Sequence, residues 1–303
     1  PQTTTLRTAD RPLREPNTPE SRFAMYEFAT PEPVRLRIEF GSGDIVIDAT
    51  DTETSSVRIE PYRDDDAGRE AMEKTTVEQR GDEIRIETPR KSGIFRRGGR
   101  LRARIEIPNG SSVEAKIDSA DLTTRGTLAS ALVKTGSGDI RLDTVNGEAS
   151  VSSGSGEVDV DHGGELTRIQ TGSGDSSVRD AKGRVQISTG SGDIRVDEAI
   201  GAVQVNSGSG DVNIGDAQSD VSVNTASGDQ NLGRASRGRV KCNAASGDIQ
   251  IGIAYGTAAW LEVNTVSGSV SSELDGSEPP GEDEETVQVK ATSVSGDITL
   301  TRA

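Results

Sequence analysis

The sequence predicts an all-β fold: a single-stranded β-solenoid, in which one chain winds into stacked coils. Three observations predict it. A short Ser-Gly-Asp motif recurs every 18 residues, apolar and polar residues alternate around it, and glycines cluster where each coil must turn. An 18-residue unit cannot bury an apolar face alone, whereas stacked units bury a continuous core. About ten coils fit the chain, and we expect them to wind as a right-handed β-helix.

The acidic residue of the motif defines the repeat. Six successive intervals are 18 residues long, and the next three are 19, 21 and 28. Identical strands in successive coils then pair about 4.8 Å apart. The acidic slot, with serine in the ninth coil, holds Asp121, Asp139, Glu157, Asp175, Asp193, Asp211, Asp229, Asp248, Ser269 and Asp297, and an earlier copy is Asp44.

Apolar residues within each repeat have the period of a strand with one buried face. The slot six residues before the acid is apolar in successive coils, as is the slot three residues after it. The slot one residue after the acid is apolar too, with Ser176 and Gln230 as exceptions, and the positions between these slots are polar. A Gly-Ser-Gly corner, such as 190–192, separates the two strands, because glycine adopts the positive φ that a sharp corner needs. The first of these slots holds Val133, Val151, Ile169, Ile187, Val205, Val223 and Cys242.

The start of the chain departs from the repeat. Residues 1–24 are rich in Pro, Thr and Arg without periodicity, which predicts a disordered extension. Residues 25–113 contain strand-like segments at irregular spacing and form an N-terminal strand and cap region. Within it, 67–74 is the segment with helical composition. The regular repeats occupy 114–253.

The end of the chain departs from it too. Residues 254–303 form irregular C-terminal coils and a cap, with an acidic loop at 276–285. The segments 287–289 and 298–300 are the last strands and are expected to close the stack. Trp260 lies where the spacing changes, and we expect it to pack in this cap rather than stack on a ligand.

These features together resemble a known family. Strand–Ser-Gly-Asp–strand coils follow an opening Met-Tyr-Glu-Phe-Ala-Thr-Pro-Glu-Pro at 25–33, and Gly-Thr-Ala-Ala-Trp-Leu stands at 256–261. The pattern resembles the bacterial putative-adhesin domain family, a domain of unknown function, and is most similar to its actinobacterial-type members. The resemblance implies that 25–303 is one β-solenoid domain with no established enzymatic activity and no catalytic residues. It also implies that Met25 is the native start.

Composition excludes several classes of protein. The net charge of −16 disfavours nucleic acids and anionic membranes as partners, because phosphates are repelled. One Cys and one His exclude an intrachain disulfide and a multi-histidine metal site. There is no integral membrane segment and no secretory leader in this sequence. These absences predict a cytoplasmic location, with the cell surface or envelope as the alternative.

The stacked acids are the first candidate for chemistry. Carboxylates about 4.8 Å apart repel one another unless they are solvated, hydrogen-bonded or paired with cations. Calcium binding is one interpretation, but the opposite turns offer no matching carboxylate ligands. The favoured interpretation is a structural turn ladder whose carboxylates accept backbone N–H bonds. The ladder comprises Asp139, Glu157, Asp175, Asp193, Asp211, Asp229 and Asp248.

Two classes of enzyme are also built on solenoids, and each needs residues that can be sought in this sequence. Hexapeptide acyltransferases need three equivalent six-residue faces, which this repeat lacks, and usually a catalytic His. His162 lies in a polar turn and is expected to be exposed. A carbohydrate-active β-helix enzyme needs clustered acids and aromatic platforms. Asp159 and Asp161 offer an acid pair, but only eight residues are aromatic. Cys242 occupies a core slot, not a nucleophile's position.

A basic stretch is the sharpest local departure from the acidic composition. It is a predicted partner-binding site for an acidic protein, a phosphate or an anionic surface. The alternative is that it neutralises the chain's own acidic coils. Its residues are Arg90, Lys91, Arg96, Arg97 and Arg100, followed by Arg102 and Arg104.

The sequence therefore predicts a non-enzymatic structural or interaction module, adhesin-like, that needs no cofactor. Its partner is an unknown protein or surface. A carbohydrate-active enzyme is the first alternative, and a calcium-binding repeat protein is the second. Self-association is also expected, because the ends of a solenoid expose unpaired strand edges unless they are capped.

Overall fold

A computed structural model describes residues 23–89, 99–274 and 285–303. These residues form two compact units, one ending at Leu128 and the other running from Ala129 to Ala303. Strands dominate both units, which confirms the all-β prediction. The boundary predicted after residue 113 falls inside a strand, Ser112–Arg125. The predicted extension at 1–24 lies almost wholly outside the described residues, as does the acidic loop at 276–285.

The N-terminal unit combines parallel and antiparallel strands around one helix. Strand β2 is its centre: it pairs in parallel with β5, β6 and β7. Strand β3 pairs antiparallel with β1 on one side and with β6 on the other, and β4 pairs antiparallel with β5. Its elements are β1 (Ala24–Ala29), β2 (Arg35–Thr50), β3 (Thr54–Pro61), α1 (Asp66–Glu73), β4 (Thr76–Arg80), β5 (Glu83–Glu87), β6 (Leu101–Pro108), β7 (Ser112–Arg125) and β8 (Thr127–Leu128).

One sequence prediction is confirmed in this unit, and the place of the early motif copy is new. The helix predicted at 67–74 is α1, which begins after an Asp65 side chain that accepts a hydrogen bond from the Gly68 N–H at 2.7 Å. The early copy of the motif stacks on a regular one, because Asp44 of β2 is in register with Asp121 of β7.

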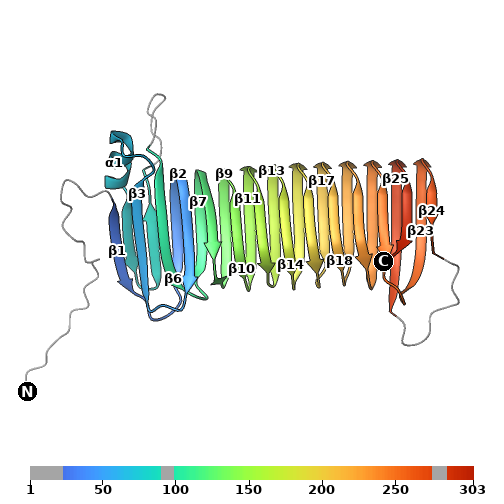
Figure 1. The fold of residues 1–303 in the computed structure, drawn as a ribbon, viewed down its shortest axis with the longest axis horizontal. Helices are drawn as coiled ribbons and strands as arrows, with labels where there is room; N and C mark the ends of the chain where they lie inside the picture. The colour runs from blue at the N-terminus through green and yellow to red at the C-terminus, as the bar shows by residue number, and fades with distance from the viewer. Residues whose placement is uncertain (1–22, 90–98, 275–284) are drawn as a thin grey trace, which may run out of the picture. The chain divides into compact units, whose positions relative to one another are not determined.

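The C-terminal unit is a stack of two-stranded coils, visible as side-by-side arrows in Figure 1. The first strand of each coil pairs in parallel with the first strand of the next, and forms layer A; the second strands form layer B. Layer A contains β9 (Ser130–Ser137), β11 (Glu148–Ser155), β13 (Leu166–Ser173), β15 (Arg184–Ser191), β17 (Val203–Ser209), β19 (Val221–Ser227), β21 (Gly238–Ser246), β23 (Ala258–Ser267) and β25 (Thr286–Ser295). Layer B contains β10 (Ile140–Val145), β12 (Val158–Gly163), β14 (Ser176–Ala181), β16 (Ile194–Ala199), β18 (Val212–Ala217), β20 (Gln230–Ala235), β22 (Ile249–Ile253), β24 (Val270–Ser272) and β26 (Ile298–Arg302).

The core of this unit lies between the two layers and follows the predicted slots. Ile187, for example, is in register with Ile169 and Val205, and all three are buried. Cys242 continues the same column, and burial raises the pKa of its thiol to about 12. It therefore behaves as a small apolar residue, and its thiol stays protonated at neutral pH.

A column of buried hydroxyls beside the corners was not predicted. Thr135, Ser153 and Thr189 each donate a side-chain hydrogen bond to the carbonyl oxygen two residues later, at 3.0 Å. These bonds satisfy polar groups that would otherwise be buried without a partner.

The order of the last coils corrects the sequence prediction. The strands at 287–289 and 298–300 do not close the stack. Instead β25 pairs with β21 on one side and β23 on the other, and β26 lies likewise between β22 and β24. The chain thus makes its outermost coil from 258–272 and then returns to fill the gap. Trp260 is 77% exposed and does not pack in a cap.

Ser176 offers a stability test of the core. It lies in layer B between Val158 and Ile194, and its buried hydroxyl has no hydrogen-bond partner in the structure. Ser176→Val is expected to stabilise the protein by about 1 kcal/mol, since it removes an unsatisfied group and adds apolar volume. Urea unfolding measures the change. Ser153→Val is the control: its hydroxyl is bonded, so this variant should lose stability, and a gain there would contradict the explanation.

Candidate functional site

The acidic ladder is held by bonds between coils. The Oδ1 atom of Asp193 accepts the backbone N–H of Asp211 at 2.9 Å, and Asp211 accepts that of Asp229 at 2.8 Å. The sequence predicted N–H bonds within each turn, whereas these bonds join each acid to the same slot one coil further on. Equivalent bonds join Asp139 to Glu157, Asp175 to Asp193, Asp229 to Asp248, Asp248 to Asp297, and Asp297 to Ser269.

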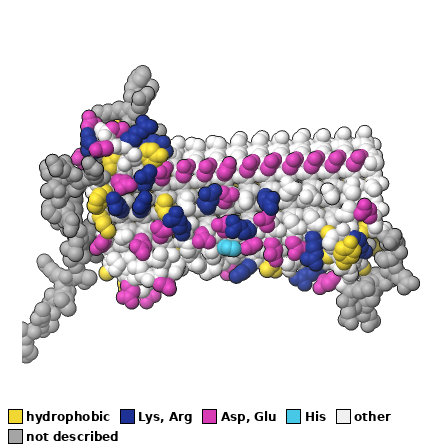
Figure 2. Space-filling model, in the orientation of Figure 1, with side chains coloured by type: hydrophobic (Ala, Val, Ile, Leu, Met, Phe, Trp, Pro, Cys, Tyr) yellow, Lys and Arg dark blue, Asp and Glu magenta, His cyan; other side chains and the backbone are white. Residues whose placement is uncertain are grey.

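In each of these bonds the positive end of an N–H dipole lies against a carboxylate oxygen. It offsets part of the repulsion along the row, which Figure 2 shows as a straight line of magenta side chains. Within the described ranges no group of three or more His, Cys, Asp or Glu side chains is arranged to hold a metal ion. The geometry accounts for the ladder without a cation.

The last bond of the ladder predicts a dependence on pH. The Ser269 N–H, 2.7 Å from Asp297 Oδ1, lowers the pKa of Asp297. A carboxyl whose pKa is lowered by folding stabilises the protein fully above its ordinary value of 3.8, and this contribution is lost as the pH falls through the folded value.

Asp297→Asn tests this dependence. The variant should be less stable than the wild type at pH 7, and the difference in unfolding midpoint should shrink below pH ~4. Urea unfolding across this pH range measures it. A difference that is the same at pH 7 and at pH ~2.5 would show that the charge of Asp297 is not involved.

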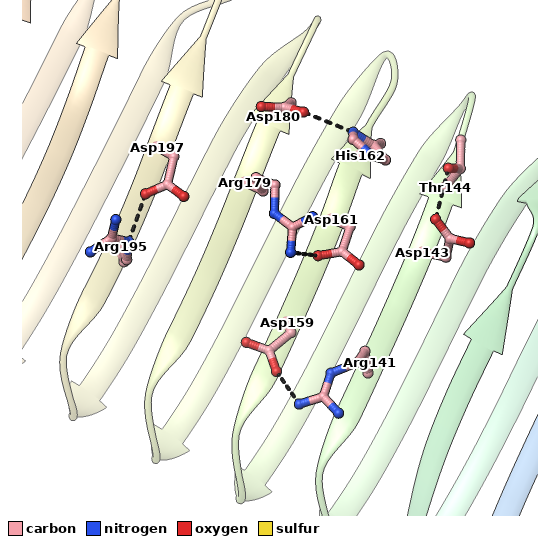
Figure 3. Close-up of polar contacts among 10 residues, drawn as sticks. All are labelled: Arg141, Asp143, Thr144, Asp159, Asp161, His162, Arg179, Asp180, Arg195 and Asp197. Carbon is pink, nitrogen blue, oxygen red and sulfur yellow. Dashed lines mark hydrogen bonds and ion pairs between the residues drawn. The ribbon is translucent and has the colours of Figure 1, made fainter.

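The outward side of layer B carries several acids paired with arginines. Figure 3 shows Arg141 bonded to Asp159 and Arg179 bonded to Asp161, both at 2.9 Å. His162 is exposed, as predicted, and its Nδ1 lies 2.9 Å from Asp180 Oδ2. In Figure 2 these charges alternate around the single cyan side chain. The acid pair of the enzyme alternative is therefore engaged in ion pairs on an open strand surface.

Layer A presents a different surface, with three hollows over its outward side. The largest of the three has a volume of about 880 Å³ and runs across β13, β15, β17, β19, β21 and β25. Glycine and alanine at one edge leave the space open. Amides line the other edge: Asn224 donates to Asn206 at 3.1 Å, and Asn243 donates to Asn224 at 2.8 Å. We call this hollow the amide groove.

A second hollow of about 440 Å³ lies beside it. Arg184, Arg239 and Lys241 line this basic hollow, together with Gln204 and Asp220 among others. Asp220 Oδ1 accepts the backbone N–H of Arg239 at 2.8 Å. In the described part of the chain, none of the three cations forms an ion pair. Three cations thus face one carboxylate in a protein of net charge −16.

The third hollow joins the other two. It has a volume of about 140 Å³, and it shares Gln204 with the basic hollow and Ser188 with the amide groove. All three therefore belong to one continuous surface of layer A. We call it the layer A surface. None of the three is lined by the acids or arginines of layer B.

The sequence did not identify this site. The positions between the apolar slots were expected to be polar, but the ladder of Asn206 was not singled out. Arg184 and Arg239 are 55 residues apart, yet both stand nine residues before the acidic slot, of Asp193 and Asp248 respectively. Residues in the same slot lie in one column on the same face of the stack. The shared spacing from the acidic residue could therefore have predicted that the two arginines face the same surface.

The predicted basic site lies mostly outside the described residues, as Arg90, Lys91, Arg96 and Arg97 fall there. Arg100 is described: its guanidinium lies 4.2 Å from the Tyr62 ring centre and 3.9 Å from Asp44 Oδ1. Arg102 lies 3.5 Å from the same carboxylate. These two cations contact acids of their own unit, and partner binding by the stretch stays a prediction.

The comparisons with known proteins agree with the architecture. A family model described as Toastrack DUF4097 matches residues 34–201 and 168–301. No curated protein matches the chain. No helix in the described part of the chain is long and apolar enough to span a bilayer.

Several solved structures are similar over nearly their whole length. A putative adhesin from Bacteroides fragilis is 14% identical, with 93% of this chain and 98% of that one covered and a TM-score of 0.41. A putative adhesin from Parabacteroides distasonis is 10% identical, with coverage of 92% and 98% and a TM-score of 0.37. A putative cell adhesion protein from Clostridium sporogenes is 10% identical, with coverage of 93% and 100% and a TM-score of 0.23. Similarity at this level carries no conclusion about function.

Proposed function

The chain belongs to the Toastrack DUF4097 family, a domain of unknown function, and on that premise we propose that it is a non-catalytic binding module whose layer A surface holds an acidic polysaccharide. The observation that carries the proposal is the basic hollow: Arg184, Arg239 and Lys241 line it and form no ion pair among the described residues, whereas Arg141 and Arg179 of layer B are bonded to acids. Unpaired cations in an acidic protein are available to a ligand's negative groups.

The shape and chemistry of the surface favour a sugar chain that carries carboxylates. The amide groove offers hydrogen-bond donors and acceptors in each coil, at the strand spacing of about 4.8 Å. Hydroxyl groups of a polysaccharide match such a row. Duplex DNA, with about one negative charge per 1.7 Å of its axis, is disfavoured by the net charge of −16. Carboxylate-bearing sugars satisfy both the groove and the basic hollow.

Polygalacturonate is a suitable probe, with uncharged galactan as its neutral counterpart. We expect the full chain to bind polygalacturonate in calorimetric titration, with an affinity that falls steeply as salt rises. The triple variant Arg184→Gln, Arg239→Gln, Lys241→Gln should bind at least about tenfold more weakly. Ala226→Trp, which fills the amide groove, should weaken binding of the same probe.

The matched control is Arg141→Gln, Arg179→Gln, Arg195→Gln on layer B, which changes the net charge by the same amount. It should bind as the wild type does once its melting curve shows that it is folded. Equal losses in both triple variants would place the effect in the overall charge rather than the layer A surface. Absence of binding to polygalacturonate would overturn the proposal.

The location of the protein in the cell needs a separate experiment. The cytoplasmic prediction is not supported by the comparisons, and a polysaccharide ligand fits the surface or envelope alternative better. Protease shaving of intact cells tests it: loss of the protein from intact cells indicates the surface, and full protection indicates the interior.

A further inference from the structure

The outermost coil of the C-terminal unit has an unpaired strand edge. Strand β23 pairs with β25, and β24 pairs with β26, each on one side within the described residues. Backbone N–H and C=O groups on the other side of β23 are thus available for pairing with a further strand. This edge exists because the chain returns between its own coils to place β25 and β26 inside.

The edge strand carries two highly exposed apolar side chains on its outward side. Trp260 is in register with Gln288 of β25, yet it is outward-facing and 77% exposed. Val266, also outward, is 75% exposed. The ten residues of β23 contain one charged residue, Glu262, and neither proline nor glycine. Exposed edges are normally protected by charges, proline or bulges, so this strand has the features of an interface.

The register of β23 identifies a second copy of the chain as its partner. A two-fold axis through the strand makes the two copies antiparallel. Opposite residues in an antiparallel pair point to the same face of the sheet. The two-fold axis must therefore pass through one residue, which pairs with its own copy, because an axis between two residues would set inward side chains opposite outward ones. In a strand of 258–267, full overlap requires the axis near its middle, at Glu262 or Val263. An axis at Glu262 opposes two like charges, which is destabilising.

An axis at Val263 instead gives complementary pairs. It sets Trp260 opposite Val266 of the second copy, and the two-fold axis repeats this pair. The two most exposed apolar side chains of the strand are thus covered in both copies. Glu262 then lies opposite Asn264. Aromatic and β-branched side chains are a favourable cross-strand pair. We infer that two copies of this chain associate through β23, antiparallel and centred on Val263.

Sedimentation velocity of the full chain tests the association, which is expected to be dimeric. Trp260→Glu should raise the dimer dissociation constant at least about tenfold. The matched control is Tyr255→Glu: Tyr255 is also 77% exposed but lies outside β23, so it should leave the dimer unchanged. A chain that stays monomeric at every soluble concentration, or equal effects of both variants, would overturn the inference.

Cysteine cross-linking tests the register. Val263→Cys should oxidise to a covalent dimer, and a mixture of Trp260→Cys with Val266→Cys should cross-link between the two variants. Native Cys242 is buried and should not react. Cross-linking of Glu262→Cys in preference to Val263→Cys would contradict the proposed axis. Because β23 lies outside the basic hollow, polygalacturonate binding by the Trp260→Glu variant should be unchanged.

Discussion

Replacing Gly192 with alanine is expected to destabilise the protein by about 3 kcal/mol or more, because two separate penalties coincide at this corner. Its φ of +125° is a conformation that L side chains rarely adopt. A Cβ atom there would also lie 2.3 Å from the carbonyl oxygen of Gly174, in the preceding coil. That oxygen is backbone, so relief requires the two coils to separate and their strand pairing to weaken.

Gly256→Ala is the control that separates the penalties. Gly256 belongs to the same unit and has a φ of +78°, but no atom lies within 4 Å of its Cβ position. It should cost about 1–2 kcal/mol, from backbone conformation alone. Urea unfolding of both variants measures the difference. Equal losses would show that the close approach of the coils, and hence the stacking argument, contributes nothing at Gly192.

The corners and the core were predictable because the same pattern of glycines and apolar residues recurs in each 18-residue unit. A single segment such as Val-Lys-Thr-Gly-Ser-Gly-Asp-Ile at 133–140 is ambiguous, but successive copies fix which slots face inward. The Gly-Ser-Gly corner and the column of Ile187 follow from this spacing, and the structure has both. The helix at α1 was predictable from composition, since 67–74 is rich in Ala, Glu, Arg, Lys and Met, which favour helices.

The order of the last coils was not predictable by the same reasoning. The strands of 258–267 and 286–295 have equal alternation, so either fits the outermost position. The difference lies in their outward slots: β23 has Trp260 and Val266, whereas β25 has Lys290 and Thr292 beside one valine. Outward apolar residues indicate an edge with a partner, a signal that alternation of the inward residues does not contain.

The candidate site was missed for a different reason. A contiguous run of arginines is visible in the sequence, and it drew the prediction to residues 90–100. The layer A surface is assembled from single residues in several repeats, each unremarkable in its own segment. Arg184, Arg239 and Lys241 line one hollow only after the coils are stacked. The strand spacing, rather than the local motif, creates the site.

Ile187→Ala is expected to destabilise the C-terminal unit by about 3 kcal/mol, the second large effect. Ile187 is 1% exposed and lies between Ile169 and Val205, both fixed by parallel pairing, so the column cannot collapse around the missing atoms. Ile200→Ala is the matched control, because Ile200 is 47% exposed in the same unit. It should change stability by about 0.5 kcal/mol or less.

The way in which Ile187→Ala unfolds tests the stacking itself. Each coil contacts only the coils beside it, so stability is a sum of coil terms and interfaces between neighbours. A cavity in the middle of the stack weakens two interfaces at once and should let the coils on either side unfold separately. Hydrogen exchange should then lose protection first in β13, β15 and β17, and least in β25. The urea transition should broaden, with a lower m-value than that of the wild type. Uniform loss of protection over the whole unit would show instead that the coils unfold as one cooperative block, with coupling that reaches beyond nearest neighbours.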